Sequence, residues 1–195
     1  VVALTTDHIS SLTVKQVGVL SATQAAAIET DDLAAMTNSE VAAFSTAAIA
    51  NLTTDQVAAI TTDQVTALTT AQVKALTTDQ VVALSTDQIS KLTATQVSAI
   101  SATQVVAIET DDLAAMTATE VAAFSTAAVA NLTTDQVGAI TTDQVSALTT
   151  AQIKALTTDQ VVALNTDQIS KLTATQVGGL SATQVAAIET DDLKL

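Results

Sequence analysis

The residues best suited to metal chemistry form three acidic clusters, each with three carboxylates within four consecutive positions. Carboxylate oxygens are preferred Ca²⁺ ligands, so calcium is the one ion these clusters suggest. They lack the glycine turn and the alternating oxygen ligands of a calcium loop. We therefore favour the simpler interpretation that they are first-turn acids at helix N-termini, where the helix dipole favours negative charge, and we expect no bound metal. The clusters are Glu29, Asp31 and Asp32; Glu109, Asp111 and Asp112; and Glu189, Asp191 and Asp192.

No other set of side chains has the composition of a catalytic site. The chain has no cysteine and a single histidine, His8, which excludes thiolate metal sites and the usual acid–base pairs. Neither a Ser–His–acid set nor a phosphate-binding loop is present. We interpret His8 as a surface or capping residue, and we expect no enzyme activity and no cofactor.

Charge and hydropathy exclude two classes of partner. The net charge is −14, with six lysines and no arginine, so nothing neutralises a run of phosphates or binds an anionic membrane. Although 48% of the residues are hydrophobic, no uninterrupted apolar stretch is long enough to cross a bilayer. We expect no nucleic acid partner and no membrane insertion.

The chain begins with Val1 rather than Met and has no signal-peptide pattern, so we interpret it as part of a longer protein.

An eight-residue repeat runs through residues 1–195 without interruption. Blocks of eight counted from Leu4, called octads below, have Leu, Ile, Met or Phe at position 1 and an apolar residue at position 6. Position 2 is mostly Ser or Thr, and position 5 is Gln in 16 of the 24 octads. A longer super-repeat of 80 residues, 29–108 and 109–188, lies on top of the octads. No linker or change of composition divides the chain, which predicts a single uninterrupted domain.

Neither a continuous helix nor a straight strand fits the octad. A helix turns by about 100° per residue, so its apolar stripe would drift by about 80° with every octad. In a strand, positions 1 and 6 would point to opposite faces. Each octad must therefore contain its own bend.

The residues after position 1 are typical of a helix start. Thr at position 2 and Gln at position 5 form a capping box, and the flanking apolar residues at positions 1 and 6 form a hydrophobic staple. Asp at position 4 falls in the first turn, where the helix dipole favours it. We predict one helix of about six residues per octad, with its cap at position 2. Representative caps are Thr53, Gln56, Thr77 and Gln80.

Such short helices are unstable alone, so neighbouring turns must stack. We predict an all-α fold: an α-solenoid, or superhelical rod, of about 24 very short helices, with positions 1 and 6 inside and positions 3, 4 and 7 outside. A β-solenoid is the alternative, because Thr and β-branched residues also suit strands. Representative residues of the predicted core are Leu52, Val57, Ile60, Val65, Leu68, Val73, Leu76 and Val81.

Other departures from the octad consensus recur at the super-repeat offset. Phe44 and Phe124 replace Leu at position 1 and are followed by STAA, which predicts either a core plug or a lateral contact surface. Four lysines at positions 7 and 8 are interpreted as solvated charges near helix C-termini, with the steering of a partner as the alternative. These lysines are Lys74, Lys91, Lys154 and Lys171.

Segments such as LTTDQVVAL, LTTAQVKAL and LTATQVSAI, each an octad and the first residue of the next, carry a resemblance that covers all 195 residues. They resemble the Leu-Thr-Thr-x-Gln-Val-x-Ala tracts of giant secreted and surface adhesin-like proteins of Gram-negative bacteria. In such proteins the tracts look like spacers, stalks or filament-forming regions. The resemblance implies an extracellular or cell-surface location, and it brings no catalytic residues with it.

Three functions follow as hypotheses. The first is a structural, non-catalytic extracellular rod, stalk or surface filament, with self-association of repeats or chains. The second is a solenoid scaffold or adhesin that recognises protein or glycan, although exposed Tyr, Trp and Arg, which favour binding, are missing. The third is an ice-binding surface made of ranks of Thr.

Overall fold

The computed structural model describes residues 6–188, and all of its regular secondary structure is α-helical. The chain divides into two compact units, residues 1–99 and 100–195, which are considered separately. The first unit contains α1 Thr6–Ser10, α2 Val14–Val17, α3 Ala22–Ala26, α4 Thr30–Ala35, α5 Asn38–Val41, α6 Thr46–Ala50, α7 Thr54–Ala59, α8 Thr62–Ala67, α9 Thr70–Ala75, α10 Thr78–Val82, α11 Thr86–Ile89 and α12 Ala94–Val97. The second contains α13 Ala102–Val105, α14 Thr110–Ala115, α15 Ala118–Val121, α16 Thr126–Val129, α17 Thr134–Ala139, α18 Thr142–Ala147, α19 Thr150–Ala155, α20 Thr158–Val162, α21 Thr166–Ser170, α22 Ala174–Gly179 and α23 Ala182–Ala187.

Each helix begins at position 3 of its octad, as the capping box predicts. In α7 the Thr53 hydroxyl accepts from the Gln56 amide at 3.1 Å, and the Gln56 Oε1 accepts from the Thr53 amide at 2.8 Å. The same reciprocal pair starts α10 at Thr77 and Gln80. These bonds satisfy two of the amide donors that every helix start leaves without a partner. Thr53 and Gln56 thus cap α7, and Thr77 and Gln80 cap α10.

The corners between helices are built from two extended residues. Between α7 and α8, Ile60 has φ −58° and ψ 132°, and Thr61 has φ −71° and ψ 158°. Any L-residue adopts these angles, and the described backbone has no residue with positive φ. This explains why a chain with so many corners needs only four glycines and no proline.

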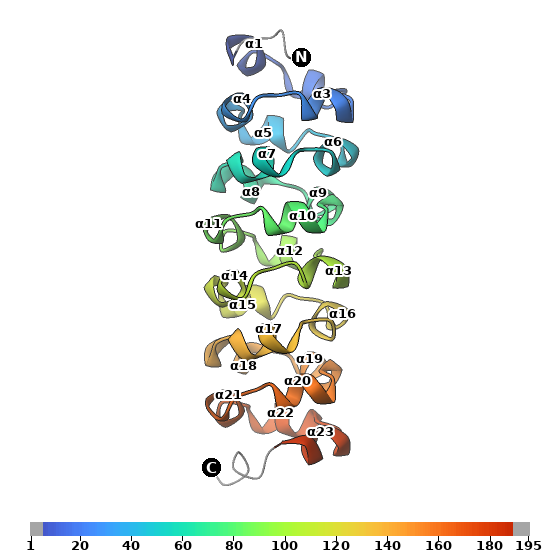
Figure 1. Cartoon of the computed structure of the whole chain (residues 1–195), viewed down its shortest axis with the longest axis vertical. Helices are drawn as coiled ribbons and strands as arrows, with labels where there is room; N and C mark the ends of the chain where they lie inside the picture. The colour runs from blue at the N-terminus through green and yellow to red at the C-terminus, as the bar shows by residue number, and fades with distance from the viewer. Residues whose placement is uncertain (1–5, 189–195) are drawn as a thin grey trace. The chain divides into compact units, whose positions relative to one another are not determined.

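Helices pack against the third helix along the chain. In the first unit α3 contacts α6, and α6 contacts α9; in the second, α13 contacts α16, and α16 contacts α19. Figure 1 shows α3, α6 and α9 stacked along one side of their unit, and α13, α16 and α19 stacked in theirs. Each unit is therefore an all-helical, solenoid-like repeat, and the β-solenoid alternative is wrong for the described residues.

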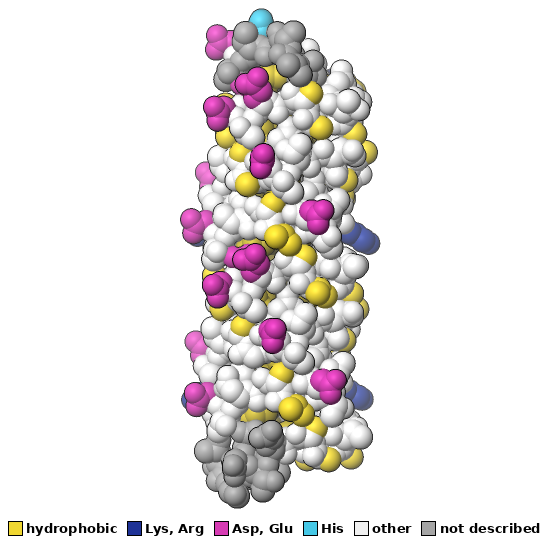
Figure 2. Space-filling model, in the orientation of Figure 1, with side chains coloured by type: hydrophobic (Ala, Val, Ile, Leu, Met, Phe, Trp, Pro, Cys, Tyr) yellow, Lys and Arg dark blue, Asp and Glu magenta, His cyan; other side chains and the backbone are white. Residues whose placement is uncertain are grey.

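Positions 1 and 6 form the core. All eight sampled core residues, from Leu52 to Val81, are buried. Positions 3 and 4 are exposed in most octads, so carboxylates at position 4 lie on the surface, where Figure 2 shows them distributed among uncharged side chains. The glutamines at position 5, to which the sequence assigned only a capping role, are also buried in most octads, Gln80 for example to 2% exposure.

Candidate functional site

The most developed polar arrangement is the column of buried glutamines at position 5. The Oε1 of each glutamine accepts from the backbone amide of its own cap, at 2.9 Å in the case of Gln80 and Thr77. This is the bond that a capping box requires, and it leaves the Nε2 group with two hydrogens to donate. Because these side chains are buried, both hydrogens need acceptors within the protein.

The Nε2 group donates to two carbonyls of the preceding turn. Gln80 donates to Ile49 O at 2.8 Å and to Leu52 O at 2.7 Å, which lie 31 and 28 residues earlier. Gln160, its equivalent in the second unit, donates to Val129 O at 3.0 Å and to Leu132 O at 2.7 Å. One side chain thus caps the start of its own helix and binds two carbonyls of an earlier turn, one near the end of the helix four octads earlier and one in the corner that follows that helix.

The two accepting carbonyls differ in their need for these donors. A position-6 carbonyl such as Ile49 O also accepts from the amide of the next position 1, Leu52, at 3.2 Å, whereas Leu52 O accepts from no described main-chain amide. The last carbonyls of an α-helix have no amide partner within the helix, and a buried orphan carbonyl costs about 1–3 kcal/mol. Here the acceptors come from position 6, near the end of a helix, and from position 1, in the extended corner that follows. The glutamine therefore provides hydrogen-bond partners at both ends of these short helices. Its Oε1 accepts at the start of its own helix, and its Nε2 donates to carbonyls near the end of an earlier one.

We call this set of inter-turn bonds the glutamine ladder. In the first unit its donors are Gln56, Gln64, Gln72, Gln80, Gln88 and Gln96. In the second they are Gln136, Gln144, Gln152, Gln160, Gln168, Gln176 and Gln184.

The ladder and the helix packing together give the size of a turn. Each helix packs on the helix three octads earlier, whereas its glutamine reaches the end of the helix four octads earlier. A turn of the solenoid therefore takes between three and four octads, or 24 to 32 residues.

The ladder is interrupted where position 5 is not glutamine. Ala48 and Ala128 are buried and have no polar side chain, and their helices start from Ser45 and Ser125 without a capping box. Glu40 is 7% exposed and keeps the capping half of the arrangement, because its Oε2 accepts from the Thr37 amide at 2.8 Å. It has no Nε2 group to offer to the preceding turn.

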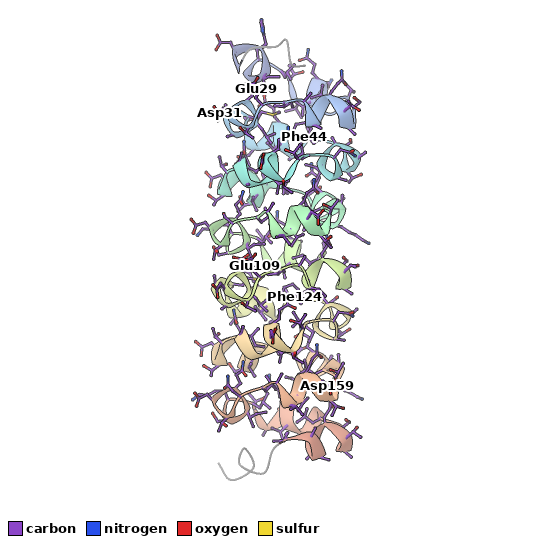
Figure 3. The ribbon with its side chains drawn as sticks, viewed as in Figure 1. Glu29, Asp31, Phe44, Glu109, Phe124 and Asp159 are labelled. Atoms are coloured by element: carbon purple, nitrogen blue, oxygen red, sulfur yellow. The ribbon has the colours of Figure 1, made fainter. Side chains whose placement is uncertain are left out.

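The acidic clusters do not gather into one site. Glu29 and Asp31 are exposed at the start of α4, where Figure 3 labels them, whereas Asp32 is buried at position 5. The second cluster has the same arrangement in α14: Glu109 is the N-cap, and Asp111 and Asp112 follow in the first turn. Within residues 6–188 no three acidic or histidine side chains are placed to hold a metal ion together. The third cluster, Glu189, Asp191 and Asp192, lies outside the described residues.

The remaining predicted residues lie as follows. Phe44 and Phe124 are both buried, which supports the core-plug interpretation; Figure 3 labels both. His8 is exposed in α1. The four lysines are exposed close to helix ends, with Lys74 and Lys154 in last turns, Lys171 at a C-cap and Lys91 one residue beyond a C-cap.

None of the helices in the described part of the chain is both long and apolar enough to span a bilayer.

The second role of glutamine was missed at the level of sequence, although a signal was present. A capping box accepts Glu as readily as Gln, and the helix dipole favours Glu. Position 5 nevertheless has Gln in 16 octads and Glu in only two, Glu40 and Glu120. That preference indicates a need for the Nε2 donor, which a carboxylate does not supply.

Comparison with known proteins gives the same period. The ALTTAQ repeat family model matches residues 25–62, 57–94, 105–142 and 137–174, well over half of the chain. Within each pair the second match starts four octads after the first, which is also the reach of one ladder donor. No curated protein matches the chain. The chain belongs to the ALTTAQ repeat family.

Proposed function

We propose that this chain is a structural, non-catalytic repeat protein that forms an extracellular rod, stalk or surface filament. The observation that carries the proposal is the glutamine ladder, because it connects successive turns with buried hydrogen bonds to main-chain carbonyls. The ladder requires only that position 5 be glutamine and that the octad phase be kept. Wherever position 5 is glutamine, turns are therefore added by the same rule, as suits a spacer.

The surface composition supports a solvated structural element. The exposed positions carry mainly Thr, Asp, Ala and Ser, and the chain has no Trp, Tyr or Arg. Interfaces draw most of their affinity from these three missing residue types. A net charge of −14 keeps such a rod soluble. No position of the octad is reserved for a nucleophile, so we propose that the chain carries no enzyme activity.

An extracellular location on a bacterial surface completes the proposal. A chain without cysteine needs no oxidising compartment and no disulfide pairing for export. The octads resemble tracts of giant secreted and surface proteins, in which such repeats look like spacers, stalks or filament-forming regions. Proteinase accessibility of the repeat on intact source cells tests the location, and protection of the repeat until the cells are lysed contradicts it.

Particle length as a function of octad number tests the structural role. Deleting residues 29–108 removes one super-repeat and keeps the octad phase. We expect small-angle X-ray scattering to show an elongated particle that shortens in proportion to the octads removed, with little loss of thermal stability. Deleting residues 29–104 instead breaks the octad phase at nearly the same chain length, so this control should lose stability. A compact particle, or equal stability of the two deletions, contradicts the proposal.

A further inference from the structure

Asparagine occupies position 8 in two of the 24 octads, and each time it begins an Asn-Leu-Thr triplet. Asn-x-Ser/Thr is the acceptor sequence for N-linked glycosylation. Because most octads open with an apolar residue and then Ser or Thr, any asparagine at position 8 creates this sequence, so its surroundings in the fold decide whether it is usable. The two triplets, one super-repeat apart, are Asn51, Leu52 and Thr53, and Asn131, Leu132 and Thr133.

Both asparagines are exposed at the end of a short helix. Asn51 is the C-cap of α6, and Asn131 directly follows the C-cap of α16. Thr53 and Thr133 are exposed in the corners that follow, with Thr53 extended at φ −70° and ψ 161°. Only the middle leucine of each triplet is buried. The two side chains that a glycosyltransferase must reach are therefore on the surface in both triplets.

The hydrogen bond of each asparagine side chain is compatible with an attached sugar. Asn51 Nδ2 donates to Ala47 O at 2.9 Å, and Asn131 Nδ2 donates to Ala127 O at 2.8 Å. An amide nitrogen carries two hydrogens, so each of these bonds uses one and leaves the other. N-glycosylation replaces a single hydrogen. The bond to the helix carbonyl is therefore retained beside a sugar, and the folded corner accommodates the modification.

The asparagines lie on a side of each unit that has no carboxylates. The helix α6 packs against α3 and α9, and α16 packs against α13 and α19 (Figure 1). The octads of these helices contain neither Asp nor Glu, and their charged residues are Lys74 in α9 and Lys154 in α19. We call the side formed by these octads in each unit the acid-free side. An activated sugar carries a negatively charged diphosphate, which carboxylates repel and lysines attract, so this side favours its approach.

We propose that Asn51 and Asn131 are N-glycosylation sites, at which a glycosyltransferase adds sugar from a sugar diphosphate donor. The bond between C1 of the sugar and the diphosphate oxygen breaks, and the diphosphate leaves with the electron pair. C1 then bonds to Nδ2, which loses one proton to a base of the transferase.

The attached sugar gives the acid-free side the solubility that charge gives the rest of the surface. Sugars are bulky and strongly hydrated, so they keep neighbouring rods apart where carboxylates do not repel. One site recurs in every super-repeat, in step with the acid-free octads. The inference goes beyond the proposed structural function and does not depend on it.

The test is peptide mass spectrometry of the repeat purified from its source cells. We expect sugar on Asn51 and Asn131 and none on Asn38 and Asn165, which are also exposed but lack Ser or Thr two residues later. The attached mass identifies the donor. A series of single-sugar increments indicates a sugar nucleotide, whereas one fixed oligosaccharide mass indicates a lipid-linked donor.

Thr53 offers a matched pair of substitutions for expression in the same cells. Thr53→Ser keeps both the triplet and a capping hydroxyl, so Asn51 should stay modified. Thr53→Asn keeps a capping side chain, of the kind that Asn165 provides for α21, but removes the hydroxyl. We expect it to abolish the modification of Asn51 and to leave Asn131 modified in the same molecule, which controls for expression and folding.

Three results overturn the inference. They are unmodified Asn51 and Asn131 in the protein from source cells, equal modification of Asn38 or Asn165, and sugar retained at Asn51 in the Thr53→Asn variant. None of them bears on the structural role, because scattering from the unmodified chain tests that role separately.

Discussion

The substitution Gln80→Glu tests the ladder with the smallest change of shape. Glutamate retains the oxygen that caps Thr77, as Glu40 does for Thr37 at 2.8 Å. It replaces Nε2 with a second oxygen that faces Ile49 O and Leu52 O, which the native amide holds at 2.8 and 2.7 Å. Two attractive contacts become repulsive at a side chain that is 2% exposed.

The expected cost follows from the groups involved. A buried carbonyl deprived of its donor costs about 1–3 kcal/mol. Ile49 O also accepts from the Leu52 amide at 3.2 Å. The cost of removing the glutamine donor from Ile49 O should therefore lie at the lower end of this range. We therefore expect Gln80→Glu to destabilise the fold by about 2–4 kcal/mol at neutral pH. The matched control is Gln16→Glu, because Gln16 has the same capping box but is exposed and has no partner for Nε2. The control should cost less than about 0.5 kcal/mol.

Native-state hydrogen exchange is the appropriate assay, since repeat chains unfold in segments rather than in a single step. The amides of octads 44–51 and 76–83 should exchange faster in Gln80→Glu, because the substitution breaks the rung between them. Acidification should restore part of the protection, since burial raises the pKa of the introduced carboxyl and the protonated form donates one hydrogen bond. This contribution is present at low pH and lost as pH rises through that raised pKa. Equal protection in Gln80→Glu and Gln16→Glu would refute the role assigned to the ladder.

Three further predictions follow from the same contacts. Glu40→Gln adds an Nε2 donor at a buried position that lacks one, and should stabilise the chain by about 1 kcal/mol, measured as a higher midpoint in urea; a lower midpoint contradicts it. Thr53→Ala removes a cap hydroxyl and should cost about 1 kcal/mol, whereas Thr54→Ala, one residue inside the helix, should cost almost nothing in the same titration. The acidic clusters should release no heat in a calorimetric titration with millimolar Ca²⁺, and saturable heat would establish the calcium site that we do not expect.

Local structure was predictable from sequence because its determinants lie within one octad. The cap at Thr53, its return from Gln56 and the staple between Leu52 and Val57 are all contained in six residues, so the start of α7 follows from the pattern alone. The burial of positions 1 and 6 follows from the same staple.

The ladder was not predicted because its acceptors are remote in sequence. Nothing within the octad of Gln80 indicates that its amide reaches Ile49 and Leu52. The number of octads per turn was open for the same reason, because it is set by how short helices stack and not by how each one starts. The excess of Gln over Glu at position 5 was the available signal, and it becomes informative once the capping role alone fails to explain it.

The most direct test of the ladder is the hydrogen exchange rate of individual glutamine side-chain amides, measured by nuclear magnetic resonance. The Nε2 protons of Gln88 are buried and donate to Val57 O at 3.0 Å and Ile60 O at 2.5 Å. Those of Gln16 and Gln24 face solvent. We predict slow exchange for Gln88 and fast exchange for Gln16 and Gln24. Equally fast exchange at all three residues would show that the turns are not joined by these side chains.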